Sequence, residues 1–237
     1  MLTLLYRIYL VLVMAPLSLV VTILTALTTI VACALGGGRW WGYYPEILWS
    51  RIVLALTLVR VKVRRNGQVS ADTSYVFVAN HQSSYDIFTI YGYLGHNFRW
   101  LMKRSLRKIP LIGYSCEKSG QVFVDRSSPS AIRRTMVEAE QRLAGGMSIV
   151  VFPEGSRTFT GKLQPFKRGA YTLAMEFGLP VVPVTIDGAF RVLPRTARWP
   201  RWGTITLTIH APIFPGPDGH HLPTLMASSE AAIASAL

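Results

Sequence analysis

The apolar positions of the chain are densest near its start. Residues 8–35 contain no charged side chain. About 20 apolar residues cross the hydrocarbon core of a bilayer, so this run predicts a membrane-associated helix. The helix either spans the bilayer with a tilt or bends at Pro16 and stays within one leaflet. Two alternatives are a cleaved leader ending near Cys33, for which the run is too long, and a buried helix of a soluble protein.

A second, shorter helix is expected after the glycines 36–38, which interrupt the first one. Pro45 can start it, and it would extend to about Arg60. Its apolar part, residues 52–59, is too short to cross a membrane. It therefore lies in the membrane interface, packs on the first helix, or belongs to the core of the next domain.

The charges around the long apolar run are asymmetric. Only Arg7 precedes it, whereas several arginines and lysines follow it. The positive-inside rule then places the remainder of the chain on the cytoplasmic side of the inner, cytoplasmic membrane. Four aromatic residues follow the run, as expected at a membrane–water interface: Trp40, Trp41, Tyr43 and Tyr44.

From residue 61 onward, short β-type runs alternate with helical ones. This alternation predicts an α/β domain with a mixed sheet flanked by helices. We therefore expect two parts, membrane-associated helices over 1–60 and a globular domain over 61–237. Strands are expected at 61–63, 75–79, 98–102, 121–124, 148–152, 181–186 and 204–209, and helices at 84–94, 129–143, 169–177 and 223–237.

The composition adds a constraint on binding partners. Half of the residues are hydrophobic, and 25 Lys and Arg oppose 12 Asp and Glu, which gives a net charge of +13. A partner that is both apolar and anionic, such as an anionic membrane lipid, accounts for both properties, whereas nucleic acid accounts only for the charge. Two cysteines form neither a disulfide framework nor a zinc quartet, and we expect no metal.

The first candidate chemistry is the sequence Asn-His-Gln-Ser-Ser-Tyr-Asp at 80–86, directly after an expected strand. If the next helix starts near Ser84, Asp86 falls in its first turn and can reach back to His81. A carboxylate on one ring nitrogen leaves the other free as a base. Alternatively, His81 caps the helix and Asp86 offsets its dipole. Ser83 and Ser84 lack the G-x-S-x-G setting of a hydrolase nucleophile.

A second candidate is Phe-Pro-Glu-Gly-Ser-Arg-Thr at 152–158, which follows the next buried strand. Gly155 allows close backbone approach, Arg157 has a planar fork suited to phosphate, and Glu154 can orient that arginine or accept from a ligand hydroxyl. A turn with a surface ion pair is the alternative. Further cations that together could surround a phosphate are Lys103, Arg104, Arg126, Lys162, Lys167 and Arg168.

These segments, with Gly-Gln-Val-Phe-Val-Asp-Arg at 120–126 and Val-Val-Pro-Val-Thr-Ile at 181–186, occur in the order of four blocks of one family. The chain resembles the PlsC-like lysophosphatidate and glycerol-phosphate acyltransferases over about residues 60–190. The resemblance implies that His81 is the base and Asp86 its partner. It also implies that the acceptor is held by Lys103, Arg126, Glu154, Gly155 and Arg157. Ser156 and Thr158 exchange the family's Thr and Ser but keep both hydroxyls.

The resemblance further implies a reaction. A fatty acyl group would pass from acyl-CoA or acyl carrier protein to the sn-2 hydroxyl of lysophosphatidate, giving phosphatidic acid without a metal or further cofactor. Residues 61–237 would be the catalytic domain, and N–H groups after His81 candidates for the oxyanion site. Three alternatives remain: another acceptor, such as glycerol 3-phosphate, a lysophospholipid or a lyso-aminolipid; a serine hydrolase using Ser83 or Ser84; and a non-enzymatic binding module.

Overall fold

The central element of the fold is one mixed β-sheet. In this computed structural model, residues 1–125, 127–143, 147–216 and 221–237 are described. Within them the strand order is β1-β7-β6-β2-β5-β3-β4, and neighbours run parallel except for β6 and β7. The mixed sheet expected from the alternating pattern is thus confirmed. The strands are β1 (Val59–Arg65), β2 (Val76–Ala79), β3 (Phe98–Lys103), β4 (Val122–Val124), β5 (Ser148–Val151), β6 (Val181–Asp187) and β7 (Gly203–Ile209).

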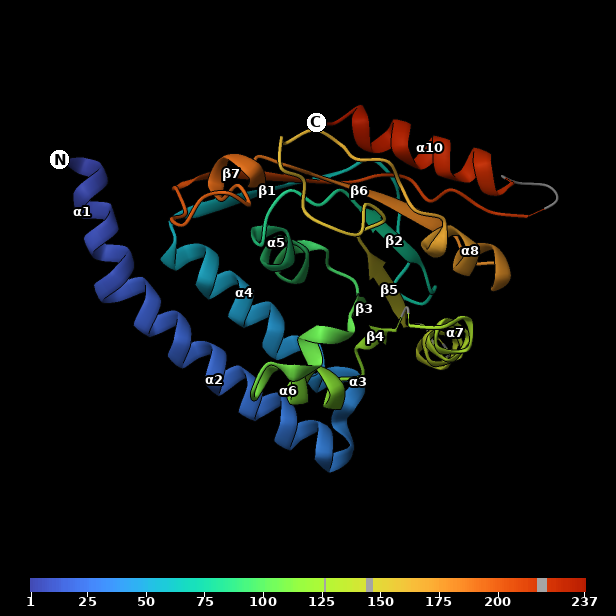
Figure 1. Ribbon diagram of the computed structural model, residues 1–237, viewed down its shortest axis with the longest axis horizontal. Helices are drawn as coiled ribbons and strands as arrows, with labels where there is room; N and C mark the ends of the chain where they lie inside the picture. Colours follow the sequence, from blue (N-terminus) through green and yellow to red (C-terminus); the bar gives the residue numbers. More distant parts are fainter. Residues whose placement is uncertain (126, 144–146, 217–220) are drawn as a thin grey trace.

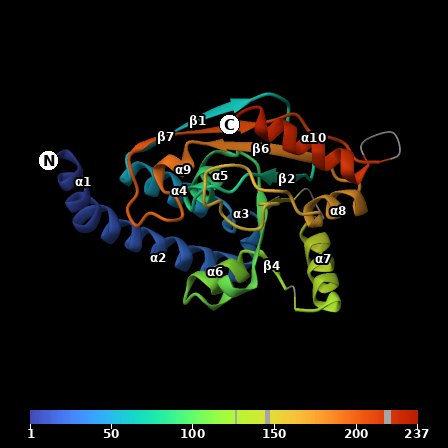
Figure 2. The ribbon, with the colours of Figure 1, turned by 45° about the horizontal axis from the view of Figure 1, so that its top comes forward.

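Helices cover both faces of this sheet. The main ones are α4 (Tyr44–Leu56), α5 (Tyr85–Tyr93), α7 (Pro129–Leu143), α8 (Gly169–Glu176) and α10 (Leu222–Ala234). Strand β2 alternates between two cores: Phe77 and Ala79 pack with α4 and α5, and Val76 and Val78 pack with α8 and α10. Figures 1 and 2 show α10 on one side of the sheet and α4 and α5 on the other. Because both faces are covered, the central strands are buried throughout.

The long apolar helix lies along one side of the domain. It extends over Leu2–Trp41 as α1 (Leu2–Tyr9), α2 (Ala15–Ala32) and α3 (Gly38–Trp41), joined by π-helical turns at Leu10–Met14 and Cys33–Gly37. It is long and apolar enough to cross a membrane, and most of its apolar surface is exposed. The part before Gly36 corresponds to about 50 Å of helix, longer than the roughly 30 Å of a bilayer core. The exposed apolar helix indicates membrane association.

Hydrogen bonds hold this helix against α4. Thr29 donates to the carboxylate of Glu46 (3.0 Å), and the indole of Trp49 donates to Thr22 (2.8 Å). Nearer the N-terminus, Tyr6 donates to the backbone oxygen of Thr57 (2.9 Å). One side of the helix is therefore fixed to protein along much of its length, while the opposite side presents apolar side chains outward.

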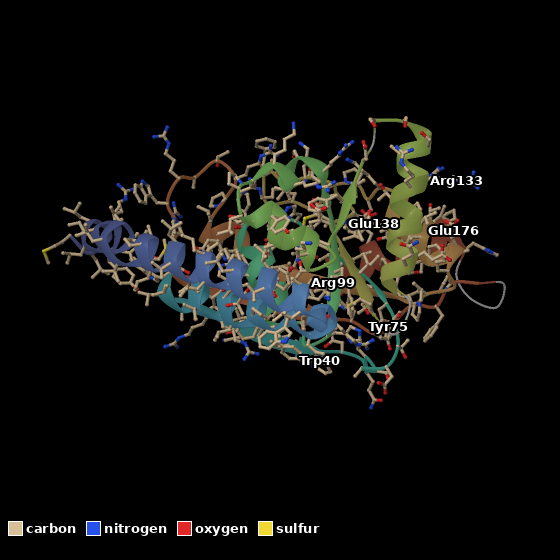
Figure 3. All side chains as sticks on the ribbon, turned by 90° about the horizontal axis from the view of Figure 1, so that it is seen from below. Trp40, Tyr75, Arg99, Arg133, Glu138 and Glu176 are labelled. Atoms are coloured by element: carbon tan, nitrogen blue, oxygen red, sulfur yellow. The ribbon has the colours of Figure 1, made fainter. Side chains whose placement is uncertain are left out.

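A buried arginine fixes the junction between α2 and α3. Gly36 (φ 96°) breaks the helix, as expected from the glycine run. The guanidinium of Arg99, from β3, donates to the backbone oxygen of Gly38 (2.8 Å) and to its own neighbour Phe98 (2.8 Å). Figure 3 shows Arg99 beside the end of the long helix. This arginine is 1% exposed, so its contacts tie the helix junction to the sheet.

Some elements depart from the sequence expectation. Helix α4 ends at Leu56 rather than near Arg60, because Leu58 (φ 56°) turns the chain and β1 starts at Val59. Leu54, on the buried face of α4, belongs to the same hydrophobic core as residues of α5. Helix α4 therefore packs on both α2 and the globular part. Among the short elements that were not predicted are α3 (Gly38–Trp41), the 3₁₀ helix η3 (Arg104–Lys108), α6 (Ile112–Lys118) and α9 (Ala189–Val192).

Candidate active site

The histidine and aspartate of the first motif meet where β2 ends and α5 begins. His81 Nδ1 lies 2.8 Å from Asp86 Oδ2, which is the contact expected from their spacing. The same oxygen accepts the backbone N–H groups of Gln82 (2.7 Å) and Ser83 (2.8 Å). Asp86 is completely buried, and burial raises its pKa, whereas these donors lower it. The carboxylate therefore fixes both the imidazole and the turn that carries it.

Stacked aromatic rings set the plane of the imidazole. The ring of Phe152 lies parallel to that of His81, with centroids 3.8 Å apart and an interplanar angle of 6°. Trp100 also stacks with Phe152, with ring centroids 5.2 Å apart. With Nδ1 held by Asp86, the second ring nitrogen of His81 has no protein partner in the described part of the chain. The His81 side chain is 16% exposed, so that nitrogen is open to a ligand.

The structure weakens two of the possibilities that the sequence left open for the residues after His81. The N–H groups of Gln82 and Ser83 donate to Asp86 and are not available for an oxyanion. The hydroxyl of Ser83 is buried and donates to the backbone oxygen of Leu193 (2.8 Å). It has no hydrogen bond to His81, which is the contact that activates a serine nucleophile. This geometry argues against a hydrolase acting through Ser83.

Glu154 joins the two sequence motifs. Its Oε1 accepts the backbone N–H of His81 (2.6 Å), and its Oε2 accepts both the backbone N–H (3.1 Å) and the side-chain amide (3.0 Å) of Gln164. Burial raises the pKa of this carboxyl, and the hydrogen bonds oppose the rise. Both oxygens are bound by protein, so the geometry gives Glu154 a positioning contact beneath the histidine. The backbone N–H of Thr158 donates to the backbone oxygen of His81 (2.9 Å), which gives a second hydrogen bond between the two motifs.

The turn after Glu154 presents backbone donors. Gly155 adopts φ 78°, a left-handed conformation that favours glycine. A Cβ there would lie 2.5 Å from Nζ of Lys167, so the ammonium lies directly over the glycine. The next two N–H groups, of Ser156 and Arg157, have no partner among the described residues. The sequence indicated Lys167 only as one of several cations that could surround a phosphate. Its position over Gly155 could not be predicted, because it depends on the loop between the two residues.

The predicted cations have different surroundings. Lys103 is exposed at the end of β3 and lines the cavity beside His81. Arg104 forms an ion pair with Asp125, so its charge is already neutralised. The side chain of Arg157 has no hydrogen-bond or ion-pair partner in the ranges that the structure covers, and it does not line the cavity. Arg126 lies outside the described residues.

The cavity beside His81 is large and mainly apolar. Its volume is about 820 Å³, and it extends from the histidine to the side of α2. At its far end Glu46 is buried, and burial raises the pKa of this carboxyl to about 7. Its lining includes His81, Lys103, Gly155 and Ser156 together with Ala26, Trp49, Ile87, Tyr91, Trp100, Leu101, Ile109, Ile112 and Phe152. A mainly apolar cavity lined by a smaller number of polar groups is typical of a ligand site.

The fold and this site define a class of protein. The family model described as "Acyltransferase" matches residues 60–187, more than half of the 237 residues, so the chain belongs to the acyltransferase family. The crystal structure of the 1-acyl-sn-glycerophosphate (LPA) acyltransferase PlsC from Thermotoga maritima is similar, with a TM-score of 0.73 and 28% identity, covering 84% of this chain and 79% of that one.

Similar curated proteins carry more specific names. A chloroplast 1-acyl-sn-glycerol-3-phosphate acyltransferase of Brassica napus is 36% identical over 61% of this chain and 42% of its own length. The chloroplast enzyme of Arabidopsis thaliana is also 36% identical, over 61% and 40%. The human 1-acyl-sn-glycerol-3-phosphate acyltransferase alpha is 35% identical over 54% and 46%. The chain thus matches about two fifths to one half of the length of these relatives.

Proposed function

We propose that this protein transfers a fatty acyl group from a thioester, acyl-CoA or acyl carrier protein, to the sn-2 hydroxyl of lysophosphatidate, forming phosphatidic acid. The observation that carries the proposal is a histidine, oriented by a buried aspartate, beside a large and mainly apolar cavity that Lys103 also lines. The similar plant and human proteins are named for this activity.

His81 acts as the base in this proposal. Asp86 holds Nδ1, so the other ring nitrogen is free to take the proton of the acceptor hydroxyl. The oxygen of that hydroxyl attacks the thioester carbonyl at the same time. The tetrahedral intermediate then collapses, the carbon–sulfur bond breaks, and the leaving thiolate takes the proton from His81. The free N–H groups of Ser156 and Arg157 are the candidates for stabilising the oxyanion, in place of those after His81.

The acceptor phosphate is held near the turn at residues 154–157. Lys103 lies on the cavity rim, Arg157 follows the two cavity-lining residues of the turn, and the ammonium of Lys167 lies over Gly155. Arg126 adds a fourth cation on the basis of the family block in which it occurs. A phosphate held by these groups positions the hydroxyl for His81, which converts binding energy into orientation. Glu154 supports the histidine backbone at the same time.

The apolar part of the cavity holds an acyl chain, and the exposed long helix keeps the site at the membrane. Because α4 and α6 pack along one side of α2, we place this helix in one leaflet, with its free side toward lipid. The charge asymmetry supports the inner membrane with the catalytic domain facing the cytoplasm, on a surface containing anionic lipid.

A substrate panel tests the proposal. The full chain in vesicles is given lysophosphatidate, glycerol 3-phosphate, lysophosphatidylcholine or a lyso-aminolipid, with acyl-CoA or acyl carrier protein, and products are measured by mass spectrometry. We expect phosphatidic acid to dominate. Faster acylation of another acceptor would replace the substrate assignment, and labelling by a serine-reactive fluorophosphonate together with hydrolysis alone would replace the reaction.

The variant Arg157→Ala separates the phosphate from the acyl donor. If the guanidinium binds the acceptor phosphate, the KM for lysophosphatidate rises by about tenfold or more, while that for acyl-CoA changes little. Equal changes in both constants would remove Arg157 from the acceptor site. Arg191→Ala is the matched control, because that arginine pairs with Asp187 on an exposed surface.

A further inference from the structure

A second cavity lies at the other end of the long helix. It has a volume of about 620 Å³ and shares no lining residue with the cavity beside His81. It lies between α1 and the loop from α9 to β7, which meet through the rings of Tyr6 and Trp202. The lining residues are Thr3, Tyr6, Arg7, Ala197, Arg198, Trp199, Pro200, Arg201 and Trp202.

The charge of this cavity is uncompensated. Three of its nine lining residues, Arg7, Arg198 and Arg201, are arginines, and none of the nine is acidic. All three are exposed. None has a side-chain hydrogen bond or an ion pair within the described ranges. A cavity with this lining attracts an anion, and guanidinium groups are suited to bind phosphate oxygens.

The cavity is held in shape by contacts between its two segments. The rings of Tyr6 and Trp202 meet edge to face at 4.8 Å, and Tyr6 also donates to the Thr57 oxygen. The loop is closed by the Arg201 N–H on the Val192 oxygen (2.8 Å). Residues nearly 200 positions apart thus form one site, which a ligand meets already assembled.

The surroundings of the cavity select a lipid as the source of the anion. Trp199 and Trp202 are 43% and 46% exposed, although large aromatic side chains are usually buried in a folded protein. On the same helix as Arg7, exposed leucines point outward at positions 2, 4 and 5. Exposed tryptophans between arginines and apolar side chains are typical of the headgroup level of a membrane.

We infer that this cavity binds the headgroup phosphate of an anionic diacyl phospholipid in the bilayer, with Arg7, Arg198 and Arg201 as its ligands. The tryptophans then lie among the glycerol and ester groups, and the leucines of α1 lie in the acyl region. This lipid site does not depend on acyl transfer. It anchors the end of the domain that is opposite the α2–α3 junction.

Native mass spectrometry of the full chain, released from nanodiscs with equal phosphatidylglycerol and phosphatidylcholine, measures this binding. The variant R7Q/R198Q/R201Q removes the proposed ligands. The control R60Q/K62Q/R64Q removes three charges from exposed positions of β1. We expect wild type and control to retain phosphatidylglycerol preferentially, and the cavity variant to lose that preference at least fivefold.

Three outcomes would overturn the inference. Equal loss in the two triple variants would indicate diffuse charge rather than a site, and no preference in wild type would remove anionic lipid as the ligand. Loss in Arg157→Ala but not in the cavity variant would place the retained lipid beside His81 instead. The melting temperatures of all variants are compared, and if the triple variant is unfolded, Arg198→Gln alone must still lower the preference at least twofold.

Discussion

Asp86→Asn is the substitution that tests the proposed base with the least change in shape. The amide oxygen can replace Oδ2 and keep the three hydrogen bonds from His81, Gln82 and Ser83. The negative charge that stabilises an imidazolium is lost, however. General-base catalysis contributes about 10²- to 10⁴-fold, so kcat should fall by that factor, equivalent to about 3–5 kcal/mol of transition-state stabilisation.

The same substitution has a cost in stability. The other carboxylate oxygen of Asp86, Oδ1, is buried and has no hydrogen-bond partner in the described chain. In Asp86→Asn an NH₂ group takes that place and is left without an acceptor, which costs about 1–3 kcal/mol. The melting temperature should therefore fall modestly, and kcat is to be measured below it by release of free thiol from acyl-CoA.

Asp72→Asn is the matched control. It makes the same chemical change at an exposed turn residue away from the site. We expect its kcat to equal that of wild type. A kcat within threefold of wild type for Asp86→Asn, in protein that is folded at the assay temperature, would refute the role of this carboxylate.

Three further predictions concern the surroundings of the site. Gly155→Ala places a Cβ 2.5 Å from the Lys167 ammonium at a positive φ, so acyl transfer should drop and the melting temperature fall by the equivalent of about 1–2 kcal/mol; unchanged values would contradict the strained turn. Lys167→Gln should raise the KM for lysophosphatidate severalfold without changing that for acyl-CoA, whereas Lys62→Gln, at an exposed position of β1, should change neither. Glu46 has a pKa of about 7 in the folded chain against 4.5 in an ordinary setting, so its folded form binds the proton more tightly and stability is lost as the pH rises from 4.5 to 7, by about 3 kcal/mol. Glu46→Gln should therefore lose less melting temperature than wild type between pH 5 and pH 8, and an equal loss would show that Glu46 does not titrate as described.

Much of the fold follows from local pattern. The buried strands β2, β5 and β6 are short runs of branched and aromatic residues bounded by turn residues, and their positions were predicted within two residues. The α4–β1 boundary was not, because Leu-Thr-Leu-Val at 56–59 suits either element. Its placement depends on the left-handed Leu58 and on pairing of β1 with β7 more than 140 residues later. Likewise α6 has no periodic signal, and its packing on α2 is a tertiary effect.

For the site, spacing was informative where the partners are close in sequence. The five-residue separation of His81 and Asp86 predicts their contact once a helix starts between them. Contacts between loops could not be predicted in this way. Pairing of Arg104 with Asp125, the two bonds from Gln164 to Glu154, and the cavity beneath α2 all depend on how separate elements pack.

In the proposed reaction, His81 removes the proton from the acceptor hydroxyl. The most direct test of this step compares wild type with His81→Ala, reconstituted in the same vesicles with lysophosphatidate and acyl-CoA, with phosphatidic acid measured by mass spectrometry at saturating substrate. We expect at least a 100-fold loss of rate in folded protein, with lysophosphatidate binding retained. Formation of phosphatidic acid by His81→Ala within threefold of the wild-type rate would contradict it.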